Sequence, residues 1–109
     1  MIFIIGGACQ GKTAYAKENF GESYQIINQY HLHVKEQLKE GKEPLTEAEN
    51  LLQEKENCII ISDEIGYGLV PTDRFERLYR ETSGRVNCYF ASQAKQVIRV
   101  ISGIGIRIK

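Results

Sequence analysis

The sequence predicts a three-layer α/β fold with a mostly parallel β-sheet. Residues 2–5 and 58–61 are apolar at every position and residues 97–101 are mainly apolar, which is typical of strands buried on both faces. Segments with helical spacing separate these runs, and strands that alternate with helices form a parallel sheet covered by helices. Residues 103–108, Gly-Ile-Gly-Ile-Arg-Ile, predict a turn and an alternating edge strand, so a C-terminal β-hairpin is expected.

The elements before the second apolar run are shorter and more polar. A helix is expected over residues 12–20, where no breaker occurs, and Gly21 ends it. Residues 24–27 form a candidate strand, and Asn28 can cap the helix that follows. The apolar residues of that helix recur every four positions, at Tyr30, Val34 and Leu38.

Capping residues predict two further helices. Thr46 and Glu49 have the spacing of a capping box and would open a short helix. Asp73 and Glu76 have the same spacing at the start of a long helical pattern. Gly84 lies inside that pattern at a cost of about 1 kcal/mol relative to alanine, so close packing or a bend is expected there.

Length and charge restrict the classes of protein that fit this chain. Its 109 residues suit one domain over residues 1–109, whose core is small enough that a second copy in a homo-oligomer would help to cover apolar faces. The 14 Lys and Arg residues balance 14 Asp and Glu residues, which argues against nucleic acid or an anionic membrane as partner. Three cysteines without a C-x-x-C pair, and no signal-like leader or long apolar stretch, predict a cytoplasmic protein with free thiols.

One motif, between the first predicted strand and the first predicted helix, points to chemistry. It has the form G-x-x-x-x-G-K-[ST] of a phosphate-binding P-loop and consists of Gly6, Gly7, Ala8, Cys9, Gln10, Gly11, Lys12 and Thr13. Glycines let backbone N–H groups converge on phosphate oxygens, and the helix N-terminus adds partial positive charge. Lys12 is expected to reach the β- and γ-phosphates, and Thr13 to offer its hydroxyl to Mg²⁺. A glycine turn that only joins strand to helix is the alternative, and the flanking elements favour the P-loop.

An acidic pair follows the second apolar run. In P-loop proteins an apolar strand delivers an acidic residue at its carboxyl end, so Asp63 would hold Mg²⁺ and Glu64 would act as the base that orients a nucleophile. The alternative is a polar loop, because many strands end in acidic residues. Carboxyl ends of parallel strands open on the same edge of a sheet, so Gly6 and Asp63 are expected in one crevice.

The histidines and the P-loop cysteine receive simpler interpretations. His31 and His33 stand two positions apart on a predicted helix, so they face nearly opposite sides and cannot both reach one ligand. Each is interpreted as a surface histidine rather than a nucleophile or metal ligand. Cys9 is interpreted as a loop residue within the phosphate-binding motif.

Several segments keep an order and spacing shared with a known family. They are the P-loop, the acidic segment at residues 63–71, the arginines at 77 and 80, Gly-Arg-Val-Asn at residues 84–87, and Ser-Gly-Ile-Gly-Ile-Arg-Ile-Lys at residues 102–109. With these segments the chain resembles the adenosylcobinamide kinase/adenosylcobinamide-phosphate guanylyltransferase family. The resemblance implies a P-loop NTPase-like fold and a bifunctional enzyme of cobalamin biosynthesis. Such an enzyme phosphorylates a hydroxyl of adenosylcobinamide and then transfers GMP from GTP to that phosphate.

The chain departs from the family pattern at several places. Cys9 and Gln10 stand where the family usually has Arg and Ser, and Asp63 stands where it usually has Asn. A middle strand that ends in aspartate is missing. The family's guanylylated histidine lies in a basic segment followed by proline and tryptophan; no such segment surrounds His31 or His33, and the chain has no tryptophan. We therefore expect no GMP adduct on either histidine.

Two functional hypotheses follow. The first is Mg²⁺-dependent phosphoryl transfer from ATP or GTP to a cobinamide-type hydroxyl, with Lys12 and Glu64 as catalytic residues and Thr13 and Asp63 at the metal. The second is a nucleotide-binding or regulatory module without transferase activity, in which the shortened middle leaves no pocket for a corrinoid. They differ in whether the loop at residues 66–71 contacts a substrate or only packs.

Overall fold

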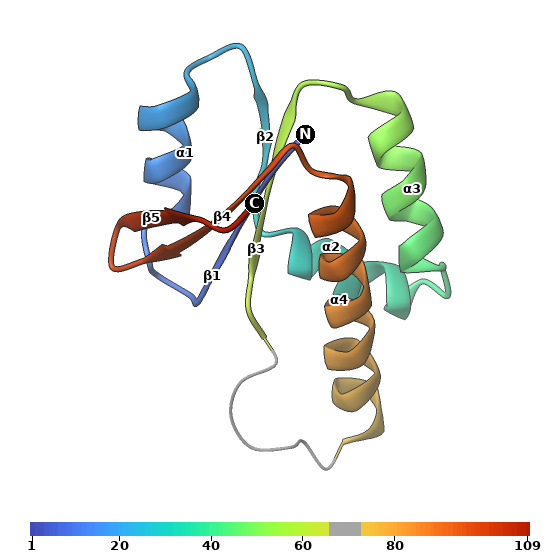
Figure 1. The fold of residues 1–109 in the computed structure, drawn as a ribbon. Helices are drawn as coiled ribbons and strands as arrows, with labels where there is room; N and C mark the ends of the chain where they lie inside the picture. Colours follow the sequence, from blue (N-terminus) through green and yellow to red (C-terminus); the bar gives the residue numbers. More distant parts are fainter. Residues whose placement is uncertain (66–72) are drawn as a thin grey trace.

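The computed structural model describes residues 1–65 and 73–109, and it has helices on both faces of a five-stranded sheet (Figure 1). The strands are β1 (Ile2–Gly6), β2 (Gln25–Ile27), β3 (Cys58–Asp63), β4 (Gln96–Ile101) and β5 (Ile104–Arg107). The helices are α1 (Lys12–Phe20), α2 (Tyr30–Lys39), α3 (Pro44–Glu54) and α4 (Arg74–Gln93). The predicted loop at residues 66–71 lies outside the described residues.

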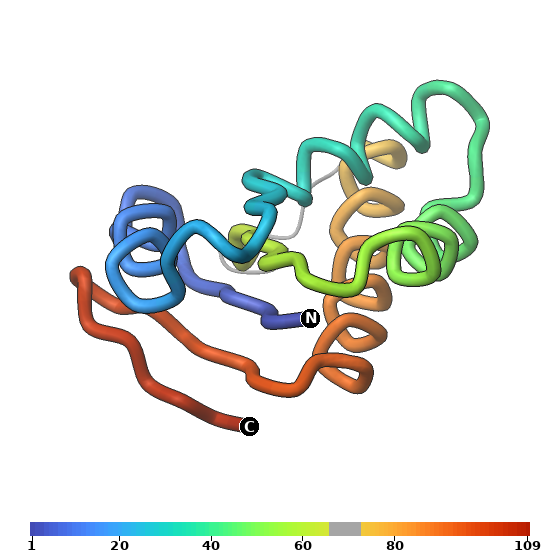
Figure 2. The backbone as a smooth tube through the Cα atoms, turned by 90° about the horizontal axis from the view of Figure 1, so that it is seen from above, coloured from blue at the N-terminus to red at the C-terminus, as the bar shows by residue number. Residues whose placement is uncertain are grey.

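The sheet has the order β2-β3-β1-β4-β5 and is parallel except for its last pair. β1 is central, as its apolar run predicts, and β4 pairs with β5 in the expected hairpin. A two-residue turn joins them, with positive φ at Ser102 (50°) and Gly103 (78°), which suits the twist of a tight hairpin. Figure 2 shows α1 on one side of the sheet and α2, α3 and α4 on the other, so the three-layer prediction is confirmed.

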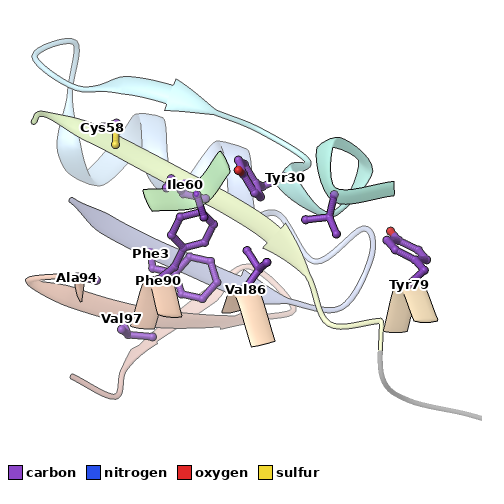
Figure 3. Close-up of a cluster of buried hydrophobic side chains, with 11 residues drawn as sticks. Phe3, Tyr30, Cys58, Ile60, Tyr79, Val86, Phe90, Ala94 and Val97 are labelled. Atoms are coloured by element: carbon purple, nitrogen blue, oxygen red, sulfur yellow. The ribbon is translucent and has the colours of Figure 1, made fainter. Parts of the chain in front are cut away.

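Two apolar clusters, one on each face, hold the layers together. The strand residues alternate between them: Phe3 and Ile60 belong to the cluster under α2, α3 and α4, whereas Ile4 and Ile59 belong to the cluster under α1. Figure 3 shows the larger cluster, in which the ring of Phe90 lies 5.7 Å from that of Phe3 (centroid to centroid). Burial of both strand faces explains why these strands are continuous apolar runs.

The helix starts differ from two of the predictions. The N-cap of α2 is Gln29 with φ 52°, not Asn28, whose side-chain oxygen instead accepts a hydrogen bond from the Gln29 N–H. α3 begins at Pro44, so Thr46 lies within its first turn and forms no capping box. Proline supplies the helical φ and lacks the N–H that a cap would satisfy. The predicted cap of α4 is confirmed, because the Asp73 side chain accepts a hydrogen bond from the Phe75 N–H.

Helix α4 is continuous through Gly84, and the expected close packing there is wrong. A Cβ built on Gly84 meets no described atom within 4 Å, so this glycine faces open space. Among the described helices, none is long and apolar enough to cross a membrane.

Candidate functional site

The P-loop joins β1 to α1, and two of its glycines have a clear steric reason. Gly6, the last residue of β1, lies against the backbone carbonyl of Val100 in β4. A Cβ at this position would collide with the carbonyl oxygen. Gly11 has φ 83°, a left-handed conformation that favours glycine, and it is the N-cap of α1. The loop therefore turns sharply enough for the helix to begin at Lys12, as predicted.

The turn of the C-terminal hairpin supports the P-loop from the side. The Ser102 N–H donates to Gln10 Oε1 over 2.6 Å, and the Gly103 N–H donates to the backbone oxygen of Gln10 over 2.8 Å. Gly11 also lies against Gly103, whose Cα is 3.4 Å from a Cβ built on Gly11. This role of Gln10 could not be predicted from the sequence, because its partners lie 92 and 93 residues further along the chain.

Lys12 is buried at the mouth of the loop, with 7% of its surface exposed. Its Nζ lies 2.7 Å from Asp63 Oδ1 and donates a hydrogen bond to the backbone oxygen of Gly7 over 2.6 Å. A buried ammonium group needs such partners, because burying an unpaired charge is costly. The structure thus places the P-loop lysine against the acidic residue at the end of β3.

Sheet register places Asp63 beside the P-loop. β1 and β3 are parallel neighbours in which Gly6 pairs with Asp63, and the Glu64 N–H donates to the backbone oxygen of Gly6 over 2.9 Å. Gly6 and Asp63 therefore lie side by side at one edge of the sheet, as expected, but of the two only Asp63 lines the cavity there, and Gly7 does not line it either. The rule that parallel strands deliver their carboxyl ends to one edge was sufficient to predict that Gly6 and Asp63 are neighbours.

His31 is not a surface residue, and this interpretation of the sequence is wrong. Only 8% of its surface is exposed, on the first turn of α2. Its Nδ1 accepts a hydrogen bond from the Asp63 N–H over 3.1 Å, and its Nε2 lies 3.5 Å from Asp63 Oδ2. Burial lowers the pKa of His31 below its ordinary value, and the Asp63 carboxylate opposes that shift. His33 is exposed, as expected, and its ring stacks on that of Tyr30.

Tyr79 of α4 joins Lys12, Asp63 and His31 in one polar cluster. Its hydroxyl donates to the backbone oxygen of His31 over 2.9 Å. Burial raises the pKa of Tyr79 to about 12, with the nearby Glu76 and Asp63 carboxylates adding to the shift. The phenol therefore stays protonated and able to donate. No sequence spacing links Tyr79, His31 and Asp63, which come from three separate elements.

Glu64 points to a different partner. Its Oε2 lies 3.1 Å from the guanidinium of Arg99 in β4, and it does not line the cavity over the P-loop. Of the two predicted acidic residues, Asp63 is the one that the structure brings to Lys12.

A cavity of about 320 Å³ opens over the P-loop. Its walls come from the loop, from the start of α1, from β3 and from the segment after β2: Ala8, Cys9, Gln10, Gly11, Lys12, Thr13, Ala14, Asn28, Gln29 and Asp63. Thr13 and Asp63 thus face the same space. Asn28 and Gln29 were not predicted as site residues, although they follow a parallel strand at the same sheet edge, which is the signal that could have found them.

The side-chain oxygen atoms of Thr13 and Asp63 at this cavity suit a hard cation better than a soft one. Mg²⁺ prefers one or two protein oxygens together with phosphates and water, and Thr13 and Asp63 offer a hydroxyl and a carboxylate. Within residues 1–65 and 73–109, no three His, Cys, Asp or Glu side chains gather as a metal site. Cys9 is exposed with φ 58°, and Cys58 and Cys88 are also free thiols.

Comparison with known proteins identifies the family. A family model described as cobinamide kinase / cobinamide phosphate guanyltransferase matches residues 23–108. The matched region begins after the P-loop and α1, so this likeness is independent of the phosphate-binding motif.

Two curated relatives carry the name bifunctional adenosylcobalamin biosynthesis protein CobU. The protein from Escherichia coli (strain K12) is 37% identical over 67 residues, 58% of this chain and 37% of the relative. The protein from Salmonella typhimurium (strain LT2) is 43% identical over 51 residues, 47% of this chain and 28% of the relative. The aligned part is well under half of either relative. From the extent of the family match, this chain belongs to the cobinamide kinase / cobinamide phosphate guanyltransferase family.

Proposed function

We propose that this chain binds a nucleoside triphosphate with Mg²⁺ at the P-loop and transfers its terminal phosphoryl group to a hydroxyl of a cobinamide-type corrinoid. The observation that supports this most is that the P-loop, Thr13 and Asp63 line one and the same cavity. Family membership supports the acceptor class, because the family description names cobinamide. ATP and GTP both remain candidate donors, since the motif contacts phosphates rather than the base.

Each residue has a distinct part in this proposal. Backbone N–H groups of the P-loop and the start of α1 would bind the phosphate oxygens. Lys12 would neutralise charge on the β- and γ-phosphates, exchanging part of its contact with Asp63 for a phosphate oxygen. Thr13 and Asp63 would hold Mg²⁺, which supplies charge neutralisation on the transferred group when bound.

Glu64 is less well placed for its expected role as the catalytic base than Asp63 is for its role at the metal. Its carboxylate is engaged by Arg99 and lies outside the lining of the cavity. A base must come within hydrogen-bond reach of the hydroxyl that it activates. Glu64 would act as the base only once the acceptor had displaced its carboxylate from Arg99.

The second candidate function is a nucleotide-binding module without transferase activity. One observation favours it: the chain aligns with well under half of each bifunctional relative. Turnover separates the two functions. The wild-type chain with Mg²⁺, ATP or GTP, and cobinamide should yield phosphorylated cobinamide; nucleotide binding without product would favour the binding module.

Asp63→Asn tests the metal part of the proposal. We expect this variant to lose about tenfold or more in nucleotide affinity in the presence of Mg²⁺ and to change little in the presence of EDTA. Calorimetric titration under both conditions measures the two affinities. Asp73→Asn is the matched control, because Asp73 caps α4 outside the cavity and should leave both affinities unchanged. Equal loss with and without Mg²⁺ would contradict a metal role for Asp63.

Guanylyl transfer through a histidine is not part of the proposal. His31 directs both ring nitrogens at Asp63, and His33 lies outside the lining of the P-loop cavity. We therefore expect no GMP adduct on either residue after incubation with GTP and Mg²⁺. Intact-mass and peptide mass spectrometry check this; an acid-labile GMP adduct on His31 or His33 would restore the second activity.

A further inference from the structure

His31 contacts Asp63 at two points, one on the backbone and one on the side chain. Nδ1 accepts the Asp63 N–H over 3.1 Å, and Nε2 lies 3.5 Å from Oδ2. The other carboxylate oxygen, Oδ1, lies 2.7 Å from Lys12 Nζ. The carboxylate therefore stands between a lysine on one side and an imidazole on the other.

The hydrogen bond that Nδ1 accepts determines the tautomer of the ring. A backbone N–H can only donate, so Nδ1 must be the unprotonated nitrogen. In the neutral imidazole the proton then resides on Nε2, which faces the carboxylate. The same ring thus fixes the end of β3 through an acceptor and faces Oδ2 with a donor.

Contacts with other elements fix the backbone of His31 and bury its side chain. Tyr79 of α4 donates to the backbone oxygen of His31, and the side chain is almost fully buried. A chain of contacts runs from Tyr79 through His31 and Asp63 to Lys12, linking α4, α2, β3 and the P-loop. A side chain locked in this way can orient the group that it touches.

We propose that His31 is a positioning residue for Asp63: it holds the carboxylate at the orientation needed for the Mg²⁺-nucleotide complex and touches neither nucleotide nor metal itself. The inference rests on the proposed function, because Asp63 must serve the metal for its orientation to matter. Partners of this kind, which hold a metal ligand, typically change metal affinity or activity 10- to 100-fold when removed.

Two substitutions separate the two contacts of the ring. His31→Asn keeps an acceptor near the position of Nδ1 and loses the donor to Oδ2. His31→Gln places its amide near the position of Nε2, so it keeps a donor to Oδ2 and loses the acceptor for the Asp63 N–H. His33→Gln is the matched control on the same helix, since His33 is exposed and makes no contact with Asp63 among the described interactions.

The measurement is nucleotide affinity by calorimetry with Mg²⁺ and with EDTA, alongside the melting temperature of each variant. We expect His31→Asn to lose about tenfold or more in affinity with Mg²⁺ and little with EDTA, and His31→Gln to recover most of the loss. A purely structural role would instead weaken both affinities together, in step with the melting temperature. That result, or wild-type Mg²⁺ dependence in both variants, would overturn the proposal.

A measurement on the wild-type chain keeps the proposal testable if the variants fold poorly. Long-range ¹H–¹⁵N spectra of the histidine side chains distinguish an Nε2-protonated ring from an Nδ1-protonated one. We expect His31 in the Nε2-protonated form, and the opposite tautomer would overturn the proposal. If the wild type binds ATP and GTP equally well with and without Mg²⁺, the proposed function fails. If Mg²⁺ strengthens binding in the wild type and in both variants alike, only the role of His31 fails.

Discussion

The proposed function places two demands on Lys12 that normally conflict, because the lysine is buried in the free protein and would have to contact phosphate in the complex. In the structure, Asp63 and the Gly7 backbone oxygen are the partners of its ammonium group. The ion pair therefore holds the ammonium group at the wall of the cavity over the P-loop, where a bound phosphate would be within its reach.

Lys12→Ala should weaken binding of Mg²⁺-nucleotide by about 10- to 100-fold, since it removes a charge-assisted contact. Calorimetric titration measures the loss, and circular dichroism shows whether the variant stays folded. Lys17→Ala is the control, because Lys17 is an exposed lysine of the same helix. Unchanged affinity in the Lys12 variant would contradict the P-loop assignment.

Tyr79 should give the fold an alkaline pH dependence. Its pKa is about 12 in the folded chain and about 10 in the unfolded chain. The unfolded state therefore loses its proton first as the pH rises, so the contribution of Tyr79 is complete below about pH 10 and declines toward pH 12. Urea unfolding of the wild type and Tyr79→Phe between about pH 8 and 11 checks this. The wild type should lose stability relative to the variant as the pH rises, and a pH-independent difference would contradict it.

At the scale of elements, helix α1 packs against the β4–β5 hairpin through a close contact between Tyr15 and Gly105. A Cβ built on Gly105 would collide with the outer atoms of the Tyr15 ring. The same hairpin supports Gln10 of the P-loop through its turn. The hairpin therefore contacts both helix α1 and the P-loop.

Gly105→Ala should destabilise the fold by about 1–3 kcal/mol, the usual cost of overpacking. Chemical unfolding measures it, and the double variant with Tyr15→Ala should lose less than the sum of the two single variants. Gly84→Ala is the control, because nothing lies near its Cβ and alanine is favoured in a helix by about 1 kcal/mol. A Gly105 variant as stable as the wild type would show that the ring moves aside freely.

Strands were easier to predict from this sequence than helix starts. Burial on both faces requires a continuous apolar run, so β1 and β3 are visible in the sequence. Helix starts depend on local backbone geometry that several residues can satisfy, as Pro44 does for α3 and Gln29 for α2. A polar side chain near the right place is therefore weak evidence for a cap.

At the scale of the whole molecule, the sheet order assembles the site from distant parts of the chain. The spacing of the motif predicted the P-loop. The common direction of the parallel strands predicted that the loop lies close to Asp63. The sequence did not predict His31 or Tyr79, because burial of a histidine depends on the tertiary contacts of α2 and α4. The hydrophobic pattern of a helix gives no sign of a polar partner that lies 32 residues away.

The outer edge of the sheet predicts association with a second copy. β5 is the last strand of the sheet, and three alternating isoleucines are exposed there: Ile104 and Ile106 in β5 and Ile108 just after it. Exposed apolar edge strands tend to pair with another chain. Light scattering after gel filtration should show a mass above that of one chain, and Ile106→Lys should lower it. A wild-type chain that stays monomeric at high concentration would contradict this.

The pairing of β1 with β3 has a consequence for how the chain tolerates change in length. Gly6 stands opposite Asp63 because every residue of the two strands is matched one to one from Ile2 and Ile59 onward. Exchanging one apolar residue for another along these strands leaves that match intact. Inserting or deleting a single residue between Cys58 and Ser62 would instead place a neighbour of Asp63 opposite Gly6. The side chain of Asp63 would then point to the other face of the sheet. The site therefore constrains the length of these strands more strictly than the identity of the apolar residues within them.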